Sequence, residues 1–361
     1  MEDPLITLET DKASLDIPAT GAGTILTVEV NVGDKVSSGN AFATLEPAAS
    51  DVPTDAGGAA ADDPAVDDEF GRTATMSAAE IAAATQTGIG ATHKAQLVVI
   101  GAGPGGYTAA FRAADLGLDV VLVERSPVLG GVCLNVGCIP SKALLHAAKV
   151  IDDAAAMADH GVVFGKPSID AGKLSDWKNQ VVSKLTGGLA TMAKQRKVKV
   201  VQATAKFVSA HRLQLDNGET LDFEHCIIAA GSEPMMLPNL PDDRRIVDST
   251  GALELAPLPK RMLVVGGGII GLEMACVYSA LGTDVSVVEL TDSLMPGTDP
   301  DLLRPFTRVI RNRYEAIMVS TRVTGMRATT PGIEVRFEGE KAPSVGVYDR
   351  VLLAVGRKAN G

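Results

Sequence analysis

The sequence predicts an α/β protein with two Rossmann-like domains, preceded by a small all-β domain and a flexible linker. Three observations support this fold class. A glycine-rich turn between a strand and a helix occurs twice, first at Gly101 and again 165 residues later at Gly266. Short alternating runs fill residues 1–46, and a stretch rich in small and acidic residues follows them. A length of 361 residues with 46% hydrophobic residues is also enough to build more than one buried core.

Residues 1–46 have the pattern of a small all-β domain, because short apolar and polar runs alternate and Gly, Pro and Asp separate them. Residues 47–94 are rich in Ala, Asp, Gly, Pro and Thr, and residues 47–69 contain seven acids and no Lys or Arg. Such a composition buries too little apolar surface to offset the entropy of ordering it. We therefore expect a flexible linker, with one short helix over residues 76–87.

Two matching glycine-rich turns define the predicted domains, residues 95–258 and residues 259–361. Each turn follows an apolar strand, opens a helix, and is followed by a second strand that ends in an acid. The matching positions are Gly101, Gly103, Gly106 and Glu124 in the first copy and Gly266, Gly268, Gly271 and Glu289 in the second. In this motif the glycines permit the turn and let the backbone approach a pyrophosphate, while the acid binds ribose hydroxyls. The alternative is a tight turn that binds nothing.

The segment GGVCLNVGCIPSK, residues 130–142, contains two cysteines five positions apart. They can close a small disulfide loop if the backbone brings them together. Cys138 lies where a helical run begins, and a helix N-terminus favours a reactive thiolate. The alternatives are two reduced buried cysteines or half of a zinc site, for which no second ligand pair is present. Cys226 and Cys276 lie in apolar runs, so core packing is the better interpretation for both.

Charge and composition exclude several classes of function. The net charge of −11 and the pI of about 5.0 argue against a nucleic-acid partner. No apolar run reaches the roughly 18 residues that a membrane span needs, and the acidic start is unlike a secretion signal. Four cysteines do not make a disulfide scaffold. We expect a soluble, cytoplasmic protein without a metal site, in which any disulfide takes part in the chemistry.

From about residue 96 to the last residue, the chain resembles the dihydrolipoyl dehydrogenases, which are flavin-dependent pyridine nucleotide-disulfide oxidoreductases. GGVCLNVGCIPSKALLH is the segment that carries this resemblance. Residues 1–46 resemble the second half of a lipoyl domain, in which Lys12 lies at the lipoyl-lysine turn. The resemblance implies contacts to FAD from Gly101, Gly103, Gly106, Glu124, Gly131, Lys142, Ala230 and Gly231. It implies contacts to NAD from Gly266, Gly268, Gly271, Glu289, Gly356 and Arg357.

The resemblance also implies roles for the reactive side chains. Cys133 is the thiol that meets the dithiol substrate, and Cys138 is the thiol that faces the flavin. Lys142 and Glu273 form an ion pair beside the flavin, where a cation stabilises reduced, anionic flavin. The implied reaction oxidises protein-bound dihydrolipoyl groups and passes the electrons through this disulfide and FAD to NAD⁺. Implied partners are the dihydrolipoyl domains of 2-oxo acid dehydrogenase acyltransferase subunits, and the whole enzyme is expected to be a homodimer.

Two other interpretations stay open. A glutathione- or mercuric-reductase-like enzyme shares this redox segment, but its preference for NADPH calls for an arginine near the second ribose site. The next arginine after Glu289 is Arg304. Alternatively, residues 1–46 are a lipoyl carrier or binding module without chemistry of its own, and Lys12 is a charged hairpin tip.

The family pattern is incomplete in this sequence. Dihydrolipoyl dehydrogenases have a later Gly-Asp motif for FAD and a His-Pro catalytic base in a C-terminal interface domain, and neither is present before Gly361. No histidine here precedes a proline, and we interpret His146 as an ordinary helix residue. The lipoyl part lacks its first half. We expect an internal fragment that has no dihydrolipoamide:NAD⁺ activity on its own.

Overall fold

The computed structural model describes residues 4–10, 13–18, 23–28, 43–47, 92–255, 257–340 and 342–361. The chain divides into two units, Met1–Thr73 and Ala74–Gly361. Lys12, the short helix expected over residues 76–87, and nearly all of the expected linker lie outside the described residues. In the described part of the chain, no helix is long and apolar enough to cross a membrane.

The N-terminal unit consists of two antiparallel strand pairs in its described residues. Strand β1 (Pro4–Thr10) pairs with β2 (Ala13–Pro18), and β3 (Gly23–Val28) pairs with β4 (Ala43–Pro47). The strands coincide with the alternating runs of the sequence, so the predicted all-β character is confirmed there.

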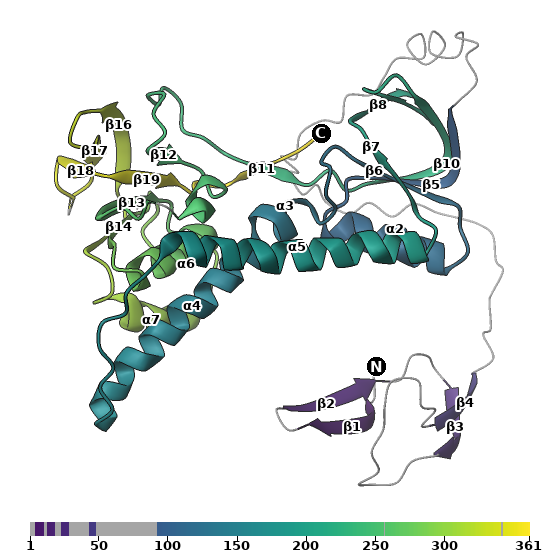
Figure 1. Ribbon diagram of the computed structural model, residues 1–361, viewed down its shortest axis with the longest axis horizontal. Helices are drawn as coiled ribbons and strands as arrows, with labels where there is room; N and C mark the ends of the chain where they lie inside the picture. The colour runs from purple at the N-terminus through teal and green to yellow at the C-terminus, as the bar shows by residue number, and fades with distance from the viewer. Residues whose placement is uncertain are drawn as a thin grey trace, which may run out of the picture. The chain divides into compact units, whose positions relative to one another are not determined.

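The first half of the larger unit is built on a six-stranded sheet with the order β7-β6-β5-β10-β9-β8 (Figure 1). The parallel strands are β5 (His93–Ile100), β6 (Val120–Glu124), β7 (Lys199–Gln202) and β10 (Thr220–Ile228). Strands β8 (Ala205–Ser209) and β9 (Arg212–Leu215) are antiparallel additions. The helices are α2 (Pro104–Asp115), α3 (Gly131–Val136), α4 (Cys138–Ala156), the 3₁₀ turn η1 (Met157–His160) and α5 (Ala171–Gln195).

The second half contains a five-stranded parallel sheet with the order β12-β19-β13-β14-β15. Its strands are β12 (Ile246–Val247), β13 (Arg261–Val265), β14 (Asp284–Val288), β15 (Ala316–Met318) and β19 (Arg350–Leu353). The helices are η2 (Gly251–Glu254), α6 (Ile269–Ala280) and α7 (Pro300–Ile310). Strands β16 (Arg322–Ala328), β17 (Ile333–Glu338) and β18 (Val345–Tyr348) form an antiparallel sheet, and β11 (Ser232–Pro234) pairs with β20 (Arg357–Ala359).

The two halves repeat one arrangement of strands, as the duplicated sequence motif predicts. In each, the strand before the glycine turn lies between the strand that follows the turn and a later parallel strand. The later strand is joined to the first by equivalent bonds, from Ala229 N to the Ile100 carbonyl at 2.8 Å and from Ala354 N to the Val265 carbonyl at 2.7 Å. The predicted α/β class with two Rossmann-like domains is confirmed.

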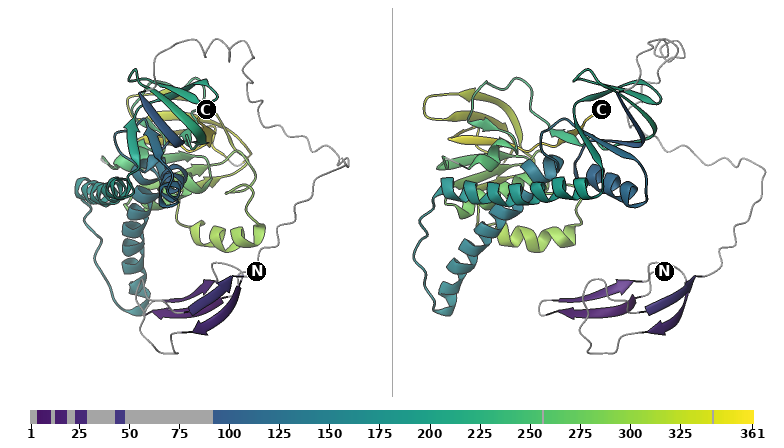
Figure 2. Two further views of the ribbon diagram at one scale, coloured as in Figure 1. Left: turned by 90° about the vertical axis from the view of Figure 1, so that its right-hand side faces the viewer. Right: turned by 45° about the vertical axis from the view of Figure 1, so that its right-hand side comes forward.

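Two long helices connect the halves. Figures 1 and 2 show α5 extending from the six-stranded sheet to the five-stranded one. Helix α4 belongs to the first half by sequence, but its Leu144 is only 1% exposed and lies in the same apolar cluster as Leu272 and Ala275 of α6. Because burying such side chains is the main stabilising contribution to packing, α4 is fixed against α6 by its apolar face.

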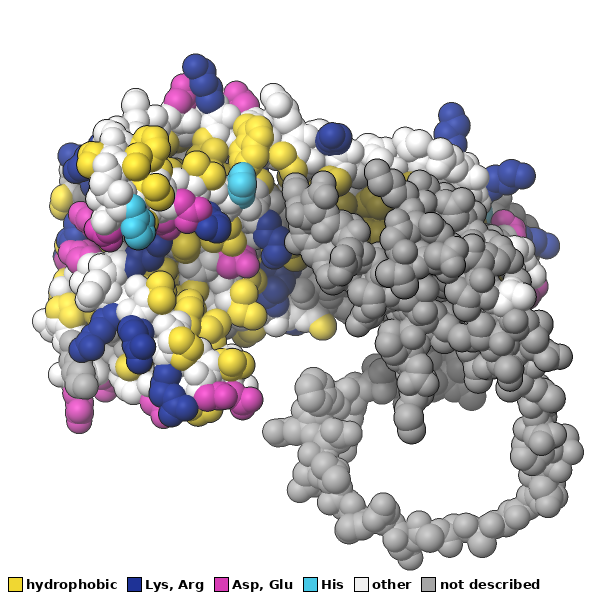
Figure 3. Space-filling view, turned by 90° about the horizontal axis from the view of Figure 1, so that it is seen from below, with side chains coloured by type: hydrophobic (Ala, Val, Ile, Leu, Met, Phe, Trp, Pro, Cys, Tyr) yellow, Lys and Arg dark blue, Asp and Glu magenta, His cyan; other side chains and the backbone are white. Residues whose placement is uncertain are grey.

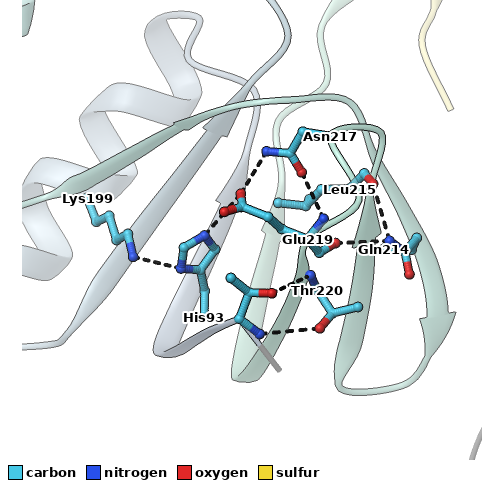
Figure 4. Close-up of polar contacts among 8 residues, drawn as sticks. His93, Lys199, Gln214, Leu215, Asn217, Glu219 and Thr220 are labelled. Carbon is cyan, nitrogen blue, oxygen red and sulfur yellow. Dashed lines mark hydrogen bonds and ion pairs between the residues drawn. The ribbon is translucent and has the colours of Figure 1, made fainter. Parts of the chain in front are cut away.

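The first strand of the larger unit is held at its start by a polar network (Figure 4). The His93 ring lies between two charged side chains, with Nδ1 2.7 Å from Lys199 Nζ and Nε2 3.2 Å from Glu219 Oε2. The lysine can only donate, so Nδ1 accepts a hydrogen bond from Lys199 and Nε2–H donates one to the Glu219 carboxylate. This network ties β5 to β7 and to the turn before β10.

The outer edge of β10 is free of a strand partner over most of its length in the described residues. Strand β9 pairs only with Thr220, Leu221 and Asp222. Toward the end of β10, Ile227 is 39% exposed and Ile228 is 65% exposed. An unpaired edge with exposed apolar side chains is a site where another strand can add.

Candidate functional site

The first glycine turn shows which of its glycines the fold requires. Gly101 has a φ of +95°, and a Cβ atom there would overlap the Ala229 carbonyl oxygen. A Cβ on Gly106 would overlap the carbonyl oxygen of Gly101. At Gly103, by contrast, the nearest atom to such a Cβ is Gly131 Cα, 3.9 Å away. The fold therefore requires the first and third glycines, whereas the second leaves open space beside the backbone.

The second glycine turn has the same geometry. Gly266 has a φ of +109° and faces the Ala354 carbonyl oxygen, and a Cβ on Gly271 would overlap the carbonyl oxygen of Gly266. No atom lies within 4 Å of a Cβ built on Gly268. Both turns thus keep the same open position, where the motif brings backbone close to a pyrophosphate.

Both turns also end at an uncapped helix. Helix α2 begins after Gly103 and α6 begins after Gly268, and neither cap residue supplies a side-chain hydrogen bond. Neither helix has an acidic residue in its first turn. The first N–H groups of a helix lack intrahelical acceptors, and they carry the positive end of the helix dipole. Each turn therefore offers a phosphate group an electropositive set of donors.

Glu124 and Glu289, the two acids that follow the turns, accept equivalent hydrogen bonds from the turn backbone. Glu124 Oε2 accepts a 2.7 Å bond from Ala102 N, and Glu289 Oε2 accepts a 2.7 Å bond from Gly267 N. The other oxygen of each accepts from a backbone N–H two residues later, at 2.8 Å. A carboxylate has about four acceptor positions, so each retains capacity for a ribose hydroxyl. The sequence did not predict this second role of holding the turn.

A cavity of about 760 Å³ extends from the first glycine turn to the two cysteines. Its volume lies within the range of small-molecule and cofactor sites. Gly103, Glu124 and Lys142 line it, and so do Ile270 and Glu273 of α6. Helix α6, which begins at the second glycine turn, therefore also borders the cavity of the first glycine turn.

The two cysteines lie on the wall of this cavity, on consecutive helices. Cys133 is in α3, and Cys138 is the first residue of α4, as the sequence predicted. Gly137 separates the helices, and a Cβ there would lie 2.8 Å from the Val132 carbonyl oxygen. Cys133 is half-buried and Cys138 is exposed, and both are free thiols.

The pKa of the Cys133 thiol is raised to about 11, first by burial and then by the hydrogen bond to Cys138 and the charge on that sulfur. The backbone N–H of Cys138 and the charge of Lys142 act in the opposite direction. A negative charge on the Cys138 sulfur would therefore favour the protonated form of Cys133. Deprotonating Cys133 therefore requires a base, and no histidine of the described chain lines the cavity.

Lys142 and Glu273 lie together, as the resemblance implied, with Nζ 3.9 Å from Oε1. The lysine side chain is 65% exposed and the glutamate 27%, so the pair is screened by solvent in the described chain. The other glutamate oxygen accepts a 2.9 Å bond from the buried Ser141 hydroxyl. The sequence did not predict a role for Ser141, since its partner is 132 positions away and no local pattern relates the two.

The remaining predicted residues gather at the β11–β20 pair. Asn360 Nδ2 donates to the Ala230 carbonyl at 2.8 Å, and Asn360 N donates to the Gly231 carbonyl at 3.0 Å. Arg357 Nε donates to Ser232 Oγ at 2.8 Å, and its side chain lines the first cavity. The resemblance had assigned Arg357 and the neighbouring Gly356, whose φ is +127°, to NAD. The structure places Arg357 with the residues assigned to FAD.

The other two cysteines lie away from this cavity lining. Cys226 packs beside the core of the first half, and Cys276 is on α6. Burial raises the pKa of both thiols, which makes them poorer nucleophiles at neutral pH. Within the described residues, no three His, Cys, Asp or Glu side chains are arranged to hold a metal ion.

Comparison with known proteins agrees with this geometry. Residues 95–361 match the family described as pyridine nucleotide-disulphide oxidoreductase. Residues 1–45 match the family described as biotin-requiring enzyme, which covers biotinyl and lipoyl domains. The two matches fall on the two parts that the sequence analysis distinguished.

The curated relatives include several dihydrolipoyl dehydrogenases. That of Vibrio cholerae is 53% identical over 273 residues, covering 74% of this chain and 57% of the relative. The dihydrolipoyl dehydrogenase of Haemophilus influenzae is 51% identical with the same coverage. Among solved structures, the HOCl-induced flavoprotein disulfide reductase RclA from Escherichia coli is similar with a TM-score of 0.63 and 27% identity, over 73% of this chain and 57% of that one. The chain thus spans little more than half the length of these relatives.

Proposed function

The chain belongs to the pyridine nucleotide-disulphide oxidoreductase family, and from this premise we propose that it acts as a dihydrolipoyl dehydrogenase. The reaction oxidises a dihydrolipoyl group to lipoyl and reduces NAD⁺ to NADH. The observation that carries the proposal is the cavity, which is lined by a dinucleotide-type turn, two thiols and a Lys–Glu pair. The family match and the identity of 51–53% to dihydrolipoyl dehydrogenases support it.

The residues around the cavity fit FAD. The open position at Gly103 and the free N–H groups of α2 suit a pyrophosphate, and Glu124 has acceptor capacity for a ribose. Gly131 lies against this turn, since a Cβ there would be 2.6 Å from Gly103 Cα. Bound FAD would supply the two-electron link between the dithiol pair and NAD⁺. Lys142 would offset the negative charge of reduced flavin at the cavity wall. When that negative charge is absent, Glu273 balances the charge of the lysine.

The two thiols perform the exchange with the substrate. One thiolate of the dihydrolipoyl group attacks the Cys133 sulfur of the Cys133–Cys138 disulfide, and the electron pair of the broken S–S bond passes to Cys138. The second substrate thiolate then attacks the substrate sulfur joined to Cys133. This closes the lipoyl disulfide and leaves Cys133 as a thiolate that takes up a proton. The raised pKa of Cys133 agrees with this outcome, in which Cys133 holds a proton.

The second glycine turn fits NAD. Gly268 leaves the open position, and the buried Glu289 is placed to receive ribose hydroxyls and to repel a 2′-phosphate. Helix α6 begins at this turn and also carries Glu273 to the first cavity. A dinucleotide bound at the turn therefore lies near the helix that borders the flavin position.

The remaining functional expectations are proposals of the same kind. We expect a lipoyl group on Lys12, a homodimer, a cytoplasmic location, and exchange with lipoyl domains of 2-oxo acid dehydrogenase complexes. The match of residues 1–45 to a biotinyl and lipoyl family supports the first. An intact mass that includes one lipoyl group, mapped to Lys12, tests it.

A second candidate function is a disulfide reductase that acts on another substrate, which the similarity to RclA favours. The two candidates differ in substrate and in nucleotide. A dihydrolipoyl dehydrogenase uses dihydrolipoamide with NAD⁺, whereas glutathione- and mercuric-reductase-like enzymes use NADPH.

The test is to measure NADH formation from dihydrolipoamide and NAD⁺ with the FAD-loaded product of the complete reading frame. We expect turnover with NAD⁺, and a loss of about 10³-fold or more in both Cys133→Ser and Cys138→Ser. Cys276→Ser is the matched control, since this partly buried cysteine lies outside the cavity lining, and it should retain most of the activity. Activity that survives Cys133→Ser would contradict the proposal.

A further inference from the structure

We propose that the cavity between α7 and β15, which lies beside the second glycine turn, is a binding site for polyphosphate anions. The cavity has a volume of about 1050 Å³ and is lined by α7, by the loop after β14, and by β15. None of its lining residues belongs to the first cavity. The proposal goes beyond the dehydrogenase function and does not depend on it.

Three arginines give the cavity its charge. Arg304, Arg308 and Arg311 all line it, and their spacing of four and three residues brings them to one face of the helix and its C-terminal end. None of the three has an ion-pair partner in the described chain. Like charges at this spacing repel one another. A bound polyanion would relieve that repulsion and accept bidentate hydrogen bonds from the guanidinium groups.

Acidic side chains do not neutralise this face. Asp292 and Glu315 line the cavity as well. Glu315, however, is occupied by Arg261, whose Nη2 lies 2.8 Å from it, and by the Ser286 hydroxyl at 3.1 Å. The cavity therefore has three unpaired cations against one unpaired carboxylate, in a chain whose net charge is −11. The local sign is opposite to that of the whole protein.

Helix α7 is also loosely covered by the rest of the chain. Ile310 is its only buried residue, and Leu302 and Val309 are 62% and 75% exposed. Figure 3 views the molecule from the side where α7 lies in Figure 1, and there dark-blue basic side chains lie among yellow apolar ones. With a volume of about 1050 Å³, the cavity beside this exposed helix has room for a triphosphate.

The cavity wall also offers hydroxyl donors. Ser293, Thr298 and Thr307 line it together with the arginines. Arginine and hydroxyl donors around an open pocket are the chemistry that recognises phosphate oxygens. A free inorganic polyphosphate and the triphosphate of a nucleotide share that chemistry.

The experiment is a calorimetric titration of the purified full chain with inorganic tripolyphosphate and, in a separate arm, with ATP. We expect saturable binding of one tripolyphosphate per chain, weakened at least about tenfold in the double variant Arg304→Gln/Arg308→Gln. Arg322→Gln is the matched control, because Arg322 is an exposed arginine without a described ion pair that lies outside the cavity. Its affinity should be unchanged.

The two arms separate the sources of the anion. ATP that binds more tightly than tripolyphosphate, with the same sensitivity to the double variant, assigns the site to a nucleotide. Equal or weaker binding with that sensitivity assigns it to the inorganic chain. The proposal is overturned if neither anion binds saturably, or if the double variant and the control respond alike. Because glutamine is neutral and of similar length at these exposed positions, we expect the variant to fold, and the single variant Arg311→Gln provides an independent check.

Discussion

The two halves of the larger unit are built around the same turn but hold different chemistry. Gly101 and Gly266 are 165 residues apart, whereas Ala229 and Ala354, which occupy equivalent places after the turn, are 125 apart. The first half is therefore longer between these points. The additional chain includes α3, α4 and α5, which bring both redox cysteines, whereas the second half has α7. In the proposed function, the two turns bind the nucleotides and these additional helices carry the reactive thiols.

The inserted helices also join the halves. Leu144 of α4 is buried in the core of the second half, and Ser141 on the same helix reaches Glu273 of α6. The thiols are thus fixed relative to the second turn as well as the first. Helix α6 thus begins at the second glycine turn and lines the cavity of the first turn with its first residues.

The largest effects are expected from the glycines that both turns require. Gly101→Ala and Gly266→Ala each force a side chain to a positive φ and against a backbone carbonyl. We expect each to lower the free energy of unfolding by about 3 kcal/mol or more, measured by urea denaturation. Gly103→Ala and Gly268→Ala are the controls, with a change of about 1 kcal/mol or less. Equal losses at all four positions would show that the turns are not built as described.

A smaller, selective effect is expected from the two acids. Glu289→Ala should weaken the use of NADH by about tenfold and narrow the gap between NADH and NADPH, because the carboxylate no longer accepts ribose bonds or repels a 2′-phosphate. Glu124→Ala should instead weaken the binding of FAD. Steady-state rates with both nucleotides and a flavin titration provide the readouts. An unchanged NADH to NADPH ratio in Glu289→Ala would place the selectivity elsewhere.

The two cavity thiols of the first half differ in their accessibility. In the reduced protein without flavin, Cys138 is exposed and Cys133 is half-buried, so we expect Cys138 to be alkylated first. Bound FAD should reverse the order by covering Cys138 and leaving Cys133 open. Peptide mapping after a short alkylation, with and without FAD, measures this. Faster labelling of Cys226 or Cys276 in either state would contradict the assignment.

The pH dependence of Cys133 gives a further prediction. Its pKa is raised to about 11, so its reactive thiolate is scarce at neutral pH, and its alkylation rate should rise about tenfold per pH unit until the pH nears 11. The positive charge of Lys142 lowers this pKa. Lys142→Met should therefore slow alkylation of Cys133 at neutral pH by a few fold, whereas the solvent-exposed Lys149→Met should leave it unchanged. A faster reaction in Lys142→Met would reverse the sign of the interaction.

The smallest effect is expected from Ser141. Its hydroxyl orients Glu273 beside Lys142, so Ser141→Ala should lower NADH formation only a few fold and shift the midpoint potential of bound flavin. Ser141→Thr keeps the hydroxyl and should restore the potential if the site admits the extra methyl group. A potential that does not move in Ser141→Ala would limit the residue to packing.

Local patterns predicted the strands, the glycine turns, the helix start at Cys138 and the all-β start of the chain. These features depend on residues that are close in the sequence. Gly101, for example, adopts a positive φ that a turn requires and that glycine allows. Contacts across long sequence separations were not visible in that way. Ser141 meets Glu273 because α4 packs on α6, and Arg357 enters the first cavity because β20 pairs with β11. The Lys142–Glu273 contact was anticipated only through the family resemblance.

The central claim is that two copies of one turn divide the nucleotides, with FAD at the first and NAD at the second. It is tested most directly by titrating Gly103→Ala and Gly268→Ala with FAD and with NADH. Both positions have open space beside the backbone, so the added methyl group blocks a ligand without straining the fold. The account predicts that Gly103→Ala loses FAD affinity but keeps NADH affinity, and that Gly268→Ala does the reverse. Loss of both ligands in either variant, or the opposite pattern, would contradict it.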